Sequence, residues 1–176
     1  LSNDGSSKNF KRDVHLMTYG DDNIMGIRKG CDFFDHTKIQ QVLADVDITY
    51  TMADKEAKSV PFINIKDANF LKRSWKWDKD VEAYLCMLEH DSIEKSLTTC
   101  VRSKTIPEEA QAVATIETAM NEYFWYGKET FEKKRALMQK IVEETPNLSL
   151  YVKDSTFPTW EELRDRFWTA SVLPDE

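Results

Sequence analysis

The feature that most restricts the fold of this chain is the turn YGDD at residues 19–22, which separates two short apolar stretches. Residues 14–18 alternate in side-chain type as a strand with two unlike faces does, and residues 24–27 resume an apolar pattern. Glycine beside aspartate supplies turn chemistry, and Gly20 permits a backbone angle that a side chain would forbid. The sequence therefore predicts an antiparallel hairpin over residues 14–27, with Asp21 and Asp22 at its exposed tip.

Two adjacent carboxylates at such a tip repel each other, and a divalent cation removes that conflict. Mg²⁺ (or Mn²⁺) suits the position, because Mg²⁺ takes one or two carboxylates together with substrate phosphates and water. The alternative is a surface turn that is merely rich in aspartate, which is common in turns. The residues of the turn leave both interpretations open.

The rest of the first half predicts more short elements. Thr37 with Gln40 fits a capping box, and apolar residues from Ile39 to Val46 follow helical spacing. Residues 48–52 predict a strand, and residues 60–65 with 69–75 predict a second hairpin. Pro61 places the first of these strands at a sheet edge or a strand start.

From about residue 81 the pattern becomes helical. Residues 81–100 predict one or two short helices, and Pro107 opens a longer one that Gly127 ends or breaks. Another helix follows over residues 128–144, and a capping box of Thr159 with Glu162 opens the last. The chain therefore divides into a strand-rich part, residues 1–79, and a helical part, residues 80–176, which makes the fold class α+β.

Composition and charge narrow the class of protein. Hydrophobic residues make up 41% and aromatic residues 11% of the 176, which excludes a disordered chain. The net charge of −7 does not indicate nucleic-acid binding, but residues 58–79 hold six basic and two acidic residues. Because contact with phosphates is local, this basic stretch is compatible with binding RNA.

The cysteines and the hydropathy exclude further classes. Three cysteines without CxxC spacing do not fit a disulfide scaffold or a zinc site. We expect them to be small buried residues with no disulfide partner. No run approaches the roughly 20 apolar residues of a membrane span, so no such span is expected.

Three motifs in order give the chain a family resemblance. Residues 19–22 (YGDD) resemble motif C of viral RNA-dependent RNA polymerases, residues 50–55 (YTMADK) resemble motif D, and residues 70–73 (FLKR) resemble motif E, the primer grip. The combination is similar to the picornavirus-like polymerases of the order Picornavirales, most of all to those of marine picorna-like viruses. The resemblance implies that residues 1–79 are the C-terminal half of a palm and residues 80–176 a helical thumb.

The resemblance also implies an activity, template-directed transfer of a nucleotide to an RNA 3′-hydroxyl by two metal ions. Asp21 matches the main metal ligand of motif C, and Asp22 matches the second, supporting carboxylate. Lys55 matches the motif D lysine that protonates the leaving pyrophosphate, a general-acid role. These three residues are therefore the expected catalytic set.

Substrate contacts follow from the same resemblance. Asn23 and Lys55 are the expected nucleotide-binding residues, and Asn23 could instead brace the turn. Lys72 and Arg73 are the expected contacts to the RNA primer. The implied partners are an RNA template and primer and nucleoside triphosphates, in the host cell cytoplasm at viral replication complexes.

One departure from the family pattern matters. Motif A, motif B and the fingers motifs are absent, and all of them lie upstream of motif C in the family. Because the chain begins at Leu1, we expect a fragment of a polymerase, inactive alone, whose partners include the remaining palm and fingers.

Two other interpretations remain. A reverse transcriptase palm also carries two aspartates on a hairpin, but it usually has another residue in place of Gly20 and lacks the pattern of residues 53–55. A non-catalytic helical interaction module would use the same aspartates only as a turn. Binding of Mg²⁺ or Mn²⁺ at Asp21 and Asp22 in a longer chain discriminates against the module.

Overall fold

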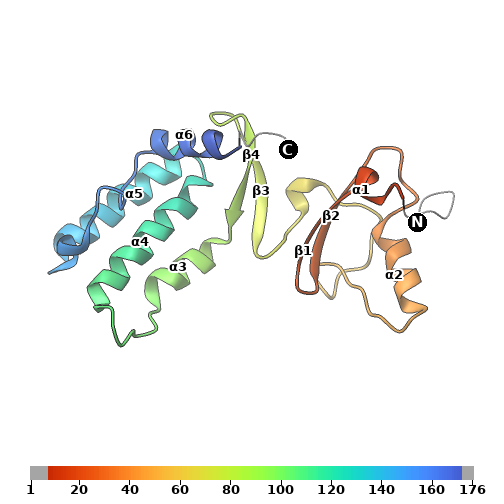
Figure 1. The fold of residues 1–176 in the computed structure, drawn as a ribbon, viewed down its shortest axis with the longest axis horizontal. Coiled ribbons are helices and arrows are strands. Elements are labelled where there is room, and N and C mark those ends of the chain that lie inside the picture. Colours follow the sequence, from red (N-terminus) through yellow and green to blue (C-terminus); the bar gives the residue numbers. More distant parts are fainter. Residues whose placement is uncertain (1–7, 172–176) are drawn as a thin grey trace. The chain divides into compact units, whose positions relative to one another are not determined.

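The computed structural model describes residues 8–171, which divide into two compact units between Lys72 and Arg73 (Figure 1). The first unit holds α1 (Phe10–Asp13), β1 (Val14–Tyr19), β2 (Asp22–Ile27), α2 (His36–Ala44) and the 3-10 turn η1 (Ile65–Asp67). The second holds β3 (Arg73–Asp78), β4 (Ala83–Leu88), α3 (His90–Thr98), α4 (Glu108–Phe124), α5 (Lys128–Glu144), the 3-10 turn η2 (Leu148–Tyr151) and α6 (Trp160–Ser171).

The predicted hairpin over residues 14–27 is confirmed. Strands β1 and β2 pair antiparallel from Val14 opposite Ile27 to Tyr19 opposite Asp22, which leaves Gly20 and Asp21 as a two-residue turn. Gly20 has a φ of 61°, and a glycine with positive φ at the first central position is what a type II′ hairpin turn requires. Asp21 and Asp22 are both exposed at the tip, as expected.

An ion-pair cluster closes the opposite end of the same hairpin. The Asp13 carboxylate accepts hydrogen bonds from Arg12 at 2.9 Å and from Arg28 at 3.2 Å, and the Arg28 backbone N–H donates to the Asp13 carbonyl. These contacts join the residue before β1 to the residue after β2. The hydrogen bonds from Arg12, with those from Arg28, lower the pKa of Asp13 from 3.8 to about 2.

This depressed pKa predicts a specific acid sensitivity. Stabilisation from the Asp13 carboxylate is complete above its unfolded pKa of 3.8 and is lost as the pH falls toward about 2. The protection of residues 14–27 against amide hydrogen exchange, relative to the intrinsic exchange rate at each pH, should therefore fall as the pH is lowered from 3.8 to about 2. Asp13→Asn should remove this pH dependence, whereas Asp32→Asn, an exposed aspartate of the same unit, should leave it in place; an unchanged profile in Asp13→Asn would contradict the assignment.

Helix α2 forms where it was predicted, but with a different cap. The side chain of Asp35, not Thr37, accepts a hydrogen bond from the Lys38 backbone N–H at 3.0 Å. Thr37 instead lies 3.1 Å from the Ser59 hydroxyl. The predicted partner Gln40 reaches the carbonyl of Tyr50, so the predicted capping box is wrong.

The predicted strand at residues 48–52 and the predicted hairpin of residues 60–65 with 69–75 are also wrong. Residues 48–52 form no strand and join no sheet within the described chain. Asn64 accepts a hydrogen bond from the Lys66 backbone N–H, which starts the 3-10 turn η1 instead of a strand. Leu71 and Lys72 then take positive φ values of 52° and 60°, and an extended strand cannot pass through that conformation.

The second hairpin lies further along the chain than predicted. Strand β3 pairs antiparallel with β4, with Trp75 opposite Cys86 and Trp77 opposite Tyr84. Residues 83–88 are therefore a strand and not part of a helix, and α3 starts only at His90. Buried and exposed side chains alternate here as they do along a strand, since Leu85 is buried at 1% exposure while its neighbour Tyr84 is exposed.

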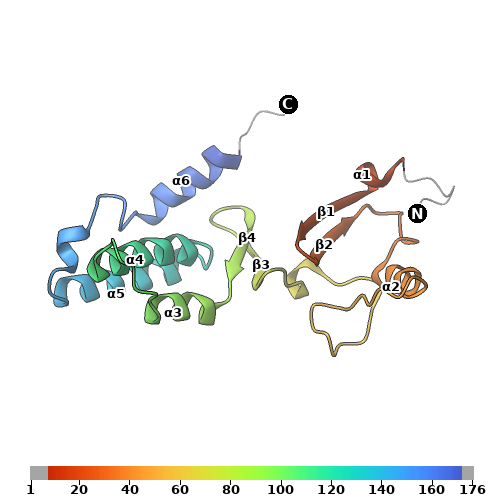
Figure 2. The same cartoon turned by 60° about the horizontal axis from the view of Figure 1, so that its bottom comes forward.

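The core of the second unit lies among its helices. Figure 2 shows α4 and α5 side by side and running in opposite directions, joined at Gly127 as predicted. Helix α4 also contacts α3, η2, α6 and strand β4, so it is the central element. The largest buried side chains of this core are Tyr123, Phe131, Leu85, Ile93, Met120 and Trp160.

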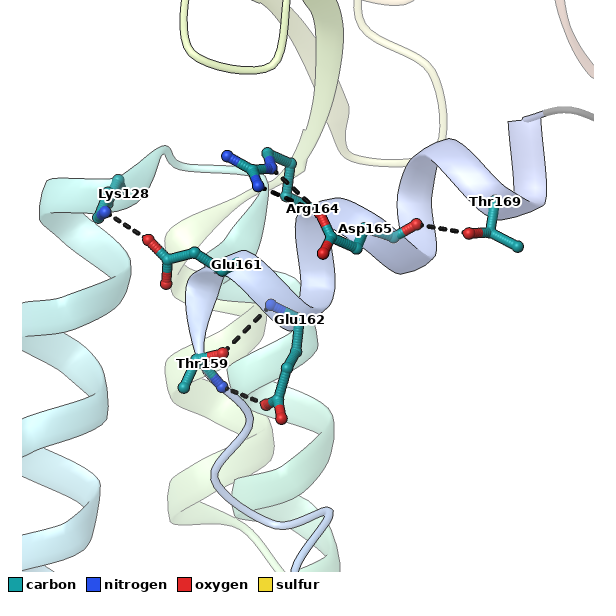
Figure 3. Close-up of polar contacts among 7 residues, drawn as sticks. All are labelled: Lys128, Thr159, Glu161, Glu162, Arg164, Asp165 and Thr169. Carbon is teal, nitrogen blue, oxygen red and sulfur yellow. Dashed lines mark hydrogen bonds and ion pairs between the residues drawn. The ribbon is translucent and has the colours of Figure 1, made fainter.

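Helix α6 begins with the predicted capping box (Figure 3). The Glu162 backbone N–H donates to the Thr159 hydroxyl at 3.2 Å, and the Thr159 backbone N–H donates to the Glu162 carboxylate at 2.8 Å. Lys128 at the start of α5 pairs with Glu161. These contacts, together with the buried ring of Trp160, fix the start of α6 on α5.

The expectation that the three cysteines are buried is wrong. Cys31 and Cys86 are only half-buried and Cys100 is exposed, and all three are free thiols. None of the helices within residues 8–171 combines the length and the apolar character that a membrane crossing needs.

Candidate functional site

The first unit contains a hollow of about 1060 Å³ that gathers most of the residues singled out in the sequence. Asp21, Asp22 and Asn23 line it from the hairpin, Lys55 from the loop after α2, and Lys72 from the end of the unit. Residues far apart in the sequence thus border one space. Arg73 lies outside this set.

Asp21 and Asp22 are presented without internal partners. Within residues 8–171, neither carboxylate takes part in a hydrogen bond or an ion pair, and both are exposed. Asp22 is the first residue of β2, so its backbone is held in the sheet opposite Tyr19. Exposed, unpaired carboxylate oxygens are suitable ligands for a hard divalent cation.

Lys55 is carried by a short turn. The Asp54 side chain accepts a hydrogen bond from the Glu56 backbone N–H at 3.1 Å, and the Asp54 carbonyl accepts one from Ala57 at 3.0 Å. This local bonding shapes the backbone around Lys55 and leaves its ammonium group exposed. An exposed ammonium group that borders the same hollow as two carboxylates can donate a proton or positive charge to a phosphate.

Tyr50 and His36 also line the hollow, although the sequence analysis did not single them out. The Tyr50 hydroxyl donates a hydrogen bond to Asn23 Oδ1 at 2.7 Å, and its ring stacks on His36 with 4.8 Å between ring centroids. The Tyr50 carbonyl accepts from Gln40, and His36 Nδ1 lies 2.8 Å from the Ser59 hydroxyl. The only sequence signal was the position of Tyr50 at the start of the YTMADK run.

Lys72 occupies a strained turn. Leu71 and Lys72 are consecutive non-glycine residues with positive φ, a conformation that costs about 1–2 kcal/mol per residue. The buried ring of Phe70 precedes them and holds the chain at the wall of the hollow. Strain of this kind persists only where the surroundings fix it, and it is concentrated at functional sites.

Arg73 has a different environment from Lys72. Its guanidinium makes a bidentate pair with the Glu122 carboxylate of α4, at 2.7 and 2.9 Å, and also donates to the Cys86 carbonyl at 3.1 Å. The hydrogen bonds with Glu122 raise the pKa of Arg73. The primer contact of Arg73 stays a prediction, but its guanidinium is already committed to joining the β3–β4 hairpin to α4.

This pair predicts a loss of stability that does not depend on RNA. Arg73→Gln and Glu122→Gln should each lower the free energy of unfolding by about 1–3 kcal/mol, because each leaves a partly buried charge without its partner. Thermal unfolding of the complete protein, with amide exchange of α4, measures the loss.

The matched control is Arg102→Gln, since the Arg102–Glu108 pair is largely exposed and should contribute well under about 1 kcal/mol. If Glu122→Gln were as stable as the unsubstituted protein, the pair would not anchor the hairpin.

A second group of potential ligands lies in the second unit. Ligand atoms of His90, Asp91 and Glu94 fall within 4.8 Å of one another, and His90 Nδ1 lies 3.2 Å from a Glu94 oxygen. His90 and Asp91 lie in the first turn of α3, where acidic side chains are favoured by the unpaired N–H groups of the helix, and Glu94 lies one turn further along. The start of the helix accounts for this cluster.

Comparison with known proteins assigns the family. The sequence profile of the family described as "Viral RNA-dependent RNA polymerase" matches residues 1–142 of the 176. The chain therefore belongs to the viral RNA-dependent RNA polymerase family.

Relatives of known identity are polyproteins of viruses in the order Picornavirales. The chain is 31% identical over 144 residues to the replicase polyprotein of Drosophila C virus, covering 80% of this chain and 8% of that polyprotein. It is 25% identical over 177 residues to the replicase polyprotein of Cricket paralysis virus, covering 97% of this chain and 9% of that polyprotein. It is 31% identical over 181 residues to the genome polyprotein of Rice tungro spherical virus, covering 99% of this chain and 5% of that polyprotein. The chain thus spans less than a tenth of the length of these relatives.

A solved structure supports the fold class. The chain resembles the sicinivirus 3Dpol RNA-dependent RNA polymerase with a TM-score of 0.60 and 18% identity, over 92% of this chain and 31% of that one. The expected α+β class, with parts of a polymerase palm and thumb, is therefore confirmed. The boundary between residues 79 and 80 and the likeness to marine viruses in particular stay predictions.

Proposed function

We propose that this chain is the part of a viral RNA-dependent RNA polymerase that carries motifs C, D and E, and that it acts in template-directed nucleotidyl transfer to an RNA 3′-hydroxyl. The observation that carries the proposal is the hairpin tip. In a chain of this family, Asp21 in a two-residue hairpin turn and Asp22 at the start of β2 present two unpaired, exposed carboxylates at the edge of a hollow.

The donor set at the tip fits a divalent cation. Polymerases of this family use divalent metal ions, and we propose Mg²⁺ (or Mn²⁺) because the available ligands are carboxylate oxygens. Such an ion would supply charge for the attacking hydroxyl and the leaving pyrophosphate. Asp21 serves as the main ligand, and Asp22 as the supporting one, its backbone fixed by β2.

Lys55 is proposed as the residue that delivers a proton to the leaving pyrophosphate. It borders the same hollow as the two aspartates, and its ammonium group is not used in an ion pair within residues 8–171. Lys72 is proposed to contact the phosphates of the primer, and Asn23 the incoming nucleotide. The substrates are then an RNA template and primer with nucleoside triphosphates.

Further parts of the same polymerase are the proposed protein partners. Leu16, Met17 and Tyr19 of the hairpin are apolar and 43–71% exposed, and α2 buries none of its residues. Exposed apolar groups on a strand and a helix indicate surfaces that pack against something else. The palm and fingers of the complete enzyme suit them, and the proposed location is the host cell cytoplasm at replication complexes.

The first test removes one negative charge from the tip. In the complete polymerase, Asp21→Asn should lower nucleotide incorporation by roughly a thousandfold or more, because the side chain keeps its volume but loses the charge that holds the cation. Asp22→Asn should have a smaller effect. Single-nucleotide incorporation under saturating Mg²⁺ measures both.

Asp80→Asn is the matched control, since Asp80 is an exposed aspartate in the loop of the other hairpin. It should leave the rate unchanged. Near-normal rates with Asp21→Asn would mean that the YGDD turn is an ordinary surface turn, and would favour a non-catalytic module.

The second test separates proton transfer from metal binding. Lys55→Leu should lower the maximal rate of incorporation by roughly a hundredfold to ten-thousandfold, the usual effect of losing a general acid, with little change in nucleotide affinity. Lys58→Leu, a nearby exposed lysine that does not line the hollow, should behave as the unsubstituted enzyme. Weaker nucleotide affinity with an intact maximal rate would reassign Lys55 to phosphate contact.

A further inference from the structure

A single hydrogen bond connects the two segments on which the proposed chemistry depends. The Tyr50 hydroxyl donates to Asn23 Oδ1 at 2.7 Å, across 27 positions of sequence. Asn23 directly follows Asp22 in β2, and Tyr50 belongs to the same loop as Lys55. The bond therefore joins the metal-binding hairpin to the loop of the proposed proton donor.

Tyr50 is itself held on several sides. Its ring stacks on the His36 ring at an interplanar angle of 27°, and its carbonyl accepts a hydrogen bond from the Gln40 amide at 2.7 Å. His36 is in turn 2.8 Å from the Ser59 hydroxyl through Nδ1. Because α2 fixes both the backbone and the ring of Tyr50, the hydroxyl reaches Asn23 from a preorganised position.

The bond also decides which end of the Asn23 side chain is available. An amide has one acceptor oxygen and an NH₂ group with two donors. The oxygen is occupied by Tyr50, and the side chain makes no other hydrogen bond within residues 8–171. The NH₂ group is thus the end left for a partner at the hollow, and its orientation depends on the Tyr50 hydroxyl.

We propose that Tyr50 is a positioning residue for nucleotidyl transfer, which orients Asn23 beside Asp22 and keeps the Lys55 loop in register with the hairpin. The proposal rests on the proposed function, because it assigns Tyr50 a role in that same site. It acts through Asn23 and not through contact with the substrate. The expected signature is therefore a change in the rate of the reaction rather than in nucleotide affinity.

The decisive variant is Tyr50→Phe in the complete polymerase, because it keeps the ring and its stack on His36 and removes only the hydroxyl. We expect kcat for single-nucleotide incorporation to fall roughly 3- to 10-fold, the range for one partly buried hydrogen bond, with KM for the nucleotide within about twofold. Tyr151→Phe is the matched control, since this tyrosine lies at the surface in η2 and should leave both constants unchanged. An unchanged kcat, or a raised KM with unchanged kcat, overturns the proposal.

A double-substitution cycle tests the path through Asn23. If the two residues act through one bond, Tyr50→Phe combined with Asn23→Ala should lose no more activity than Asn23→Ala alone. Losses that multiply would mean independent roles and would overturn the proposal.

Amide hydrogen exchange gives a readout that does not need activity. Residues 14–27 and 48–55 should exchange faster in Tyr50→Phe than in the unsubstituted polymerase, and unchanged exchange in both segments counts against the contact. This separates two failures. If Asp21→Asn stays active, the proposed function fails, whereas an inactive Asp21→Asn with a fully active Tyr50→Phe overturns only the role of Tyr50.

Discussion

The two-residue turn at Gly20 and Asp21 is the constraint on which the first unit depends. Because side chains alternate along a strand, a shift of one residue in the pairing of β1 with β2 would turn every side chain to the opposite face. The positive φ of Gly20 fixes the turn, and the turn fixes the register from Tyr19 opposite Asp22 to Val14 opposite Ile27. The exposure of the two aspartates, the place of Asn23 and its bond to Tyr50 all follow from that register.

The two units differ in how they are stabilised. The second has a continuous core around α4, in which Tyr123, Phe131 and Met120 are fully buried. In the first, the described chain buries few apolar residues, among them Val14, Ala68 and Phe70, while much of its hairpin and of α2 faces outward. A segment that presents reactive groups on a scaffold with little core of its own is consistent with a part of a larger enzyme, and the small share of the viral polyproteins that it spans agrees.

Sequence reasoning succeeded where structure is determined locally. The hairpin at residues 14–27, the long helices and the Thr159–Glu162 box depend on neighbours within a few positions, and the sequence predicted them. It failed where a distant partner decides. Strand β3 forms after a left-handed turn at Leu71 and Lys72, and its first residue is anchored by Glu122, 49 positions away.

The candidate site shows the same division between local and distant determinants. Asp21, Asp22 and Lys55 were recognisable from motifs, and the structure places them around one hollow. The Tyr50–Asn23 bond could not be inferred, because an aromatic residue in a segment predicted to be a strand gives no indication of which side chain its hydroxyl will meet. The pairing of Arg73 with Glu122 could not be inferred either, because the two residues lie 49 positions apart in the sequence.

The pairing of Arg73 with Glu122 alters what the basic stretch can offer to an RNA. By sequence, residues 58–79 carry six cationic side chains, but one of them is neutralised within the protein by a carboxylate that lies outside the stretch. Each cation that contacts a phosphate releases bound counterions, and each such contact steepens the fall of the logarithm of affinity with the logarithm of salt concentration by roughly 0.7 to 0.9. For the proposed binding of RNA through this stretch, the salt dependence should therefore reflect at most five cations as long as Arg73 stays paired with Glu122, which is a shallower slope than the sequence alone suggests.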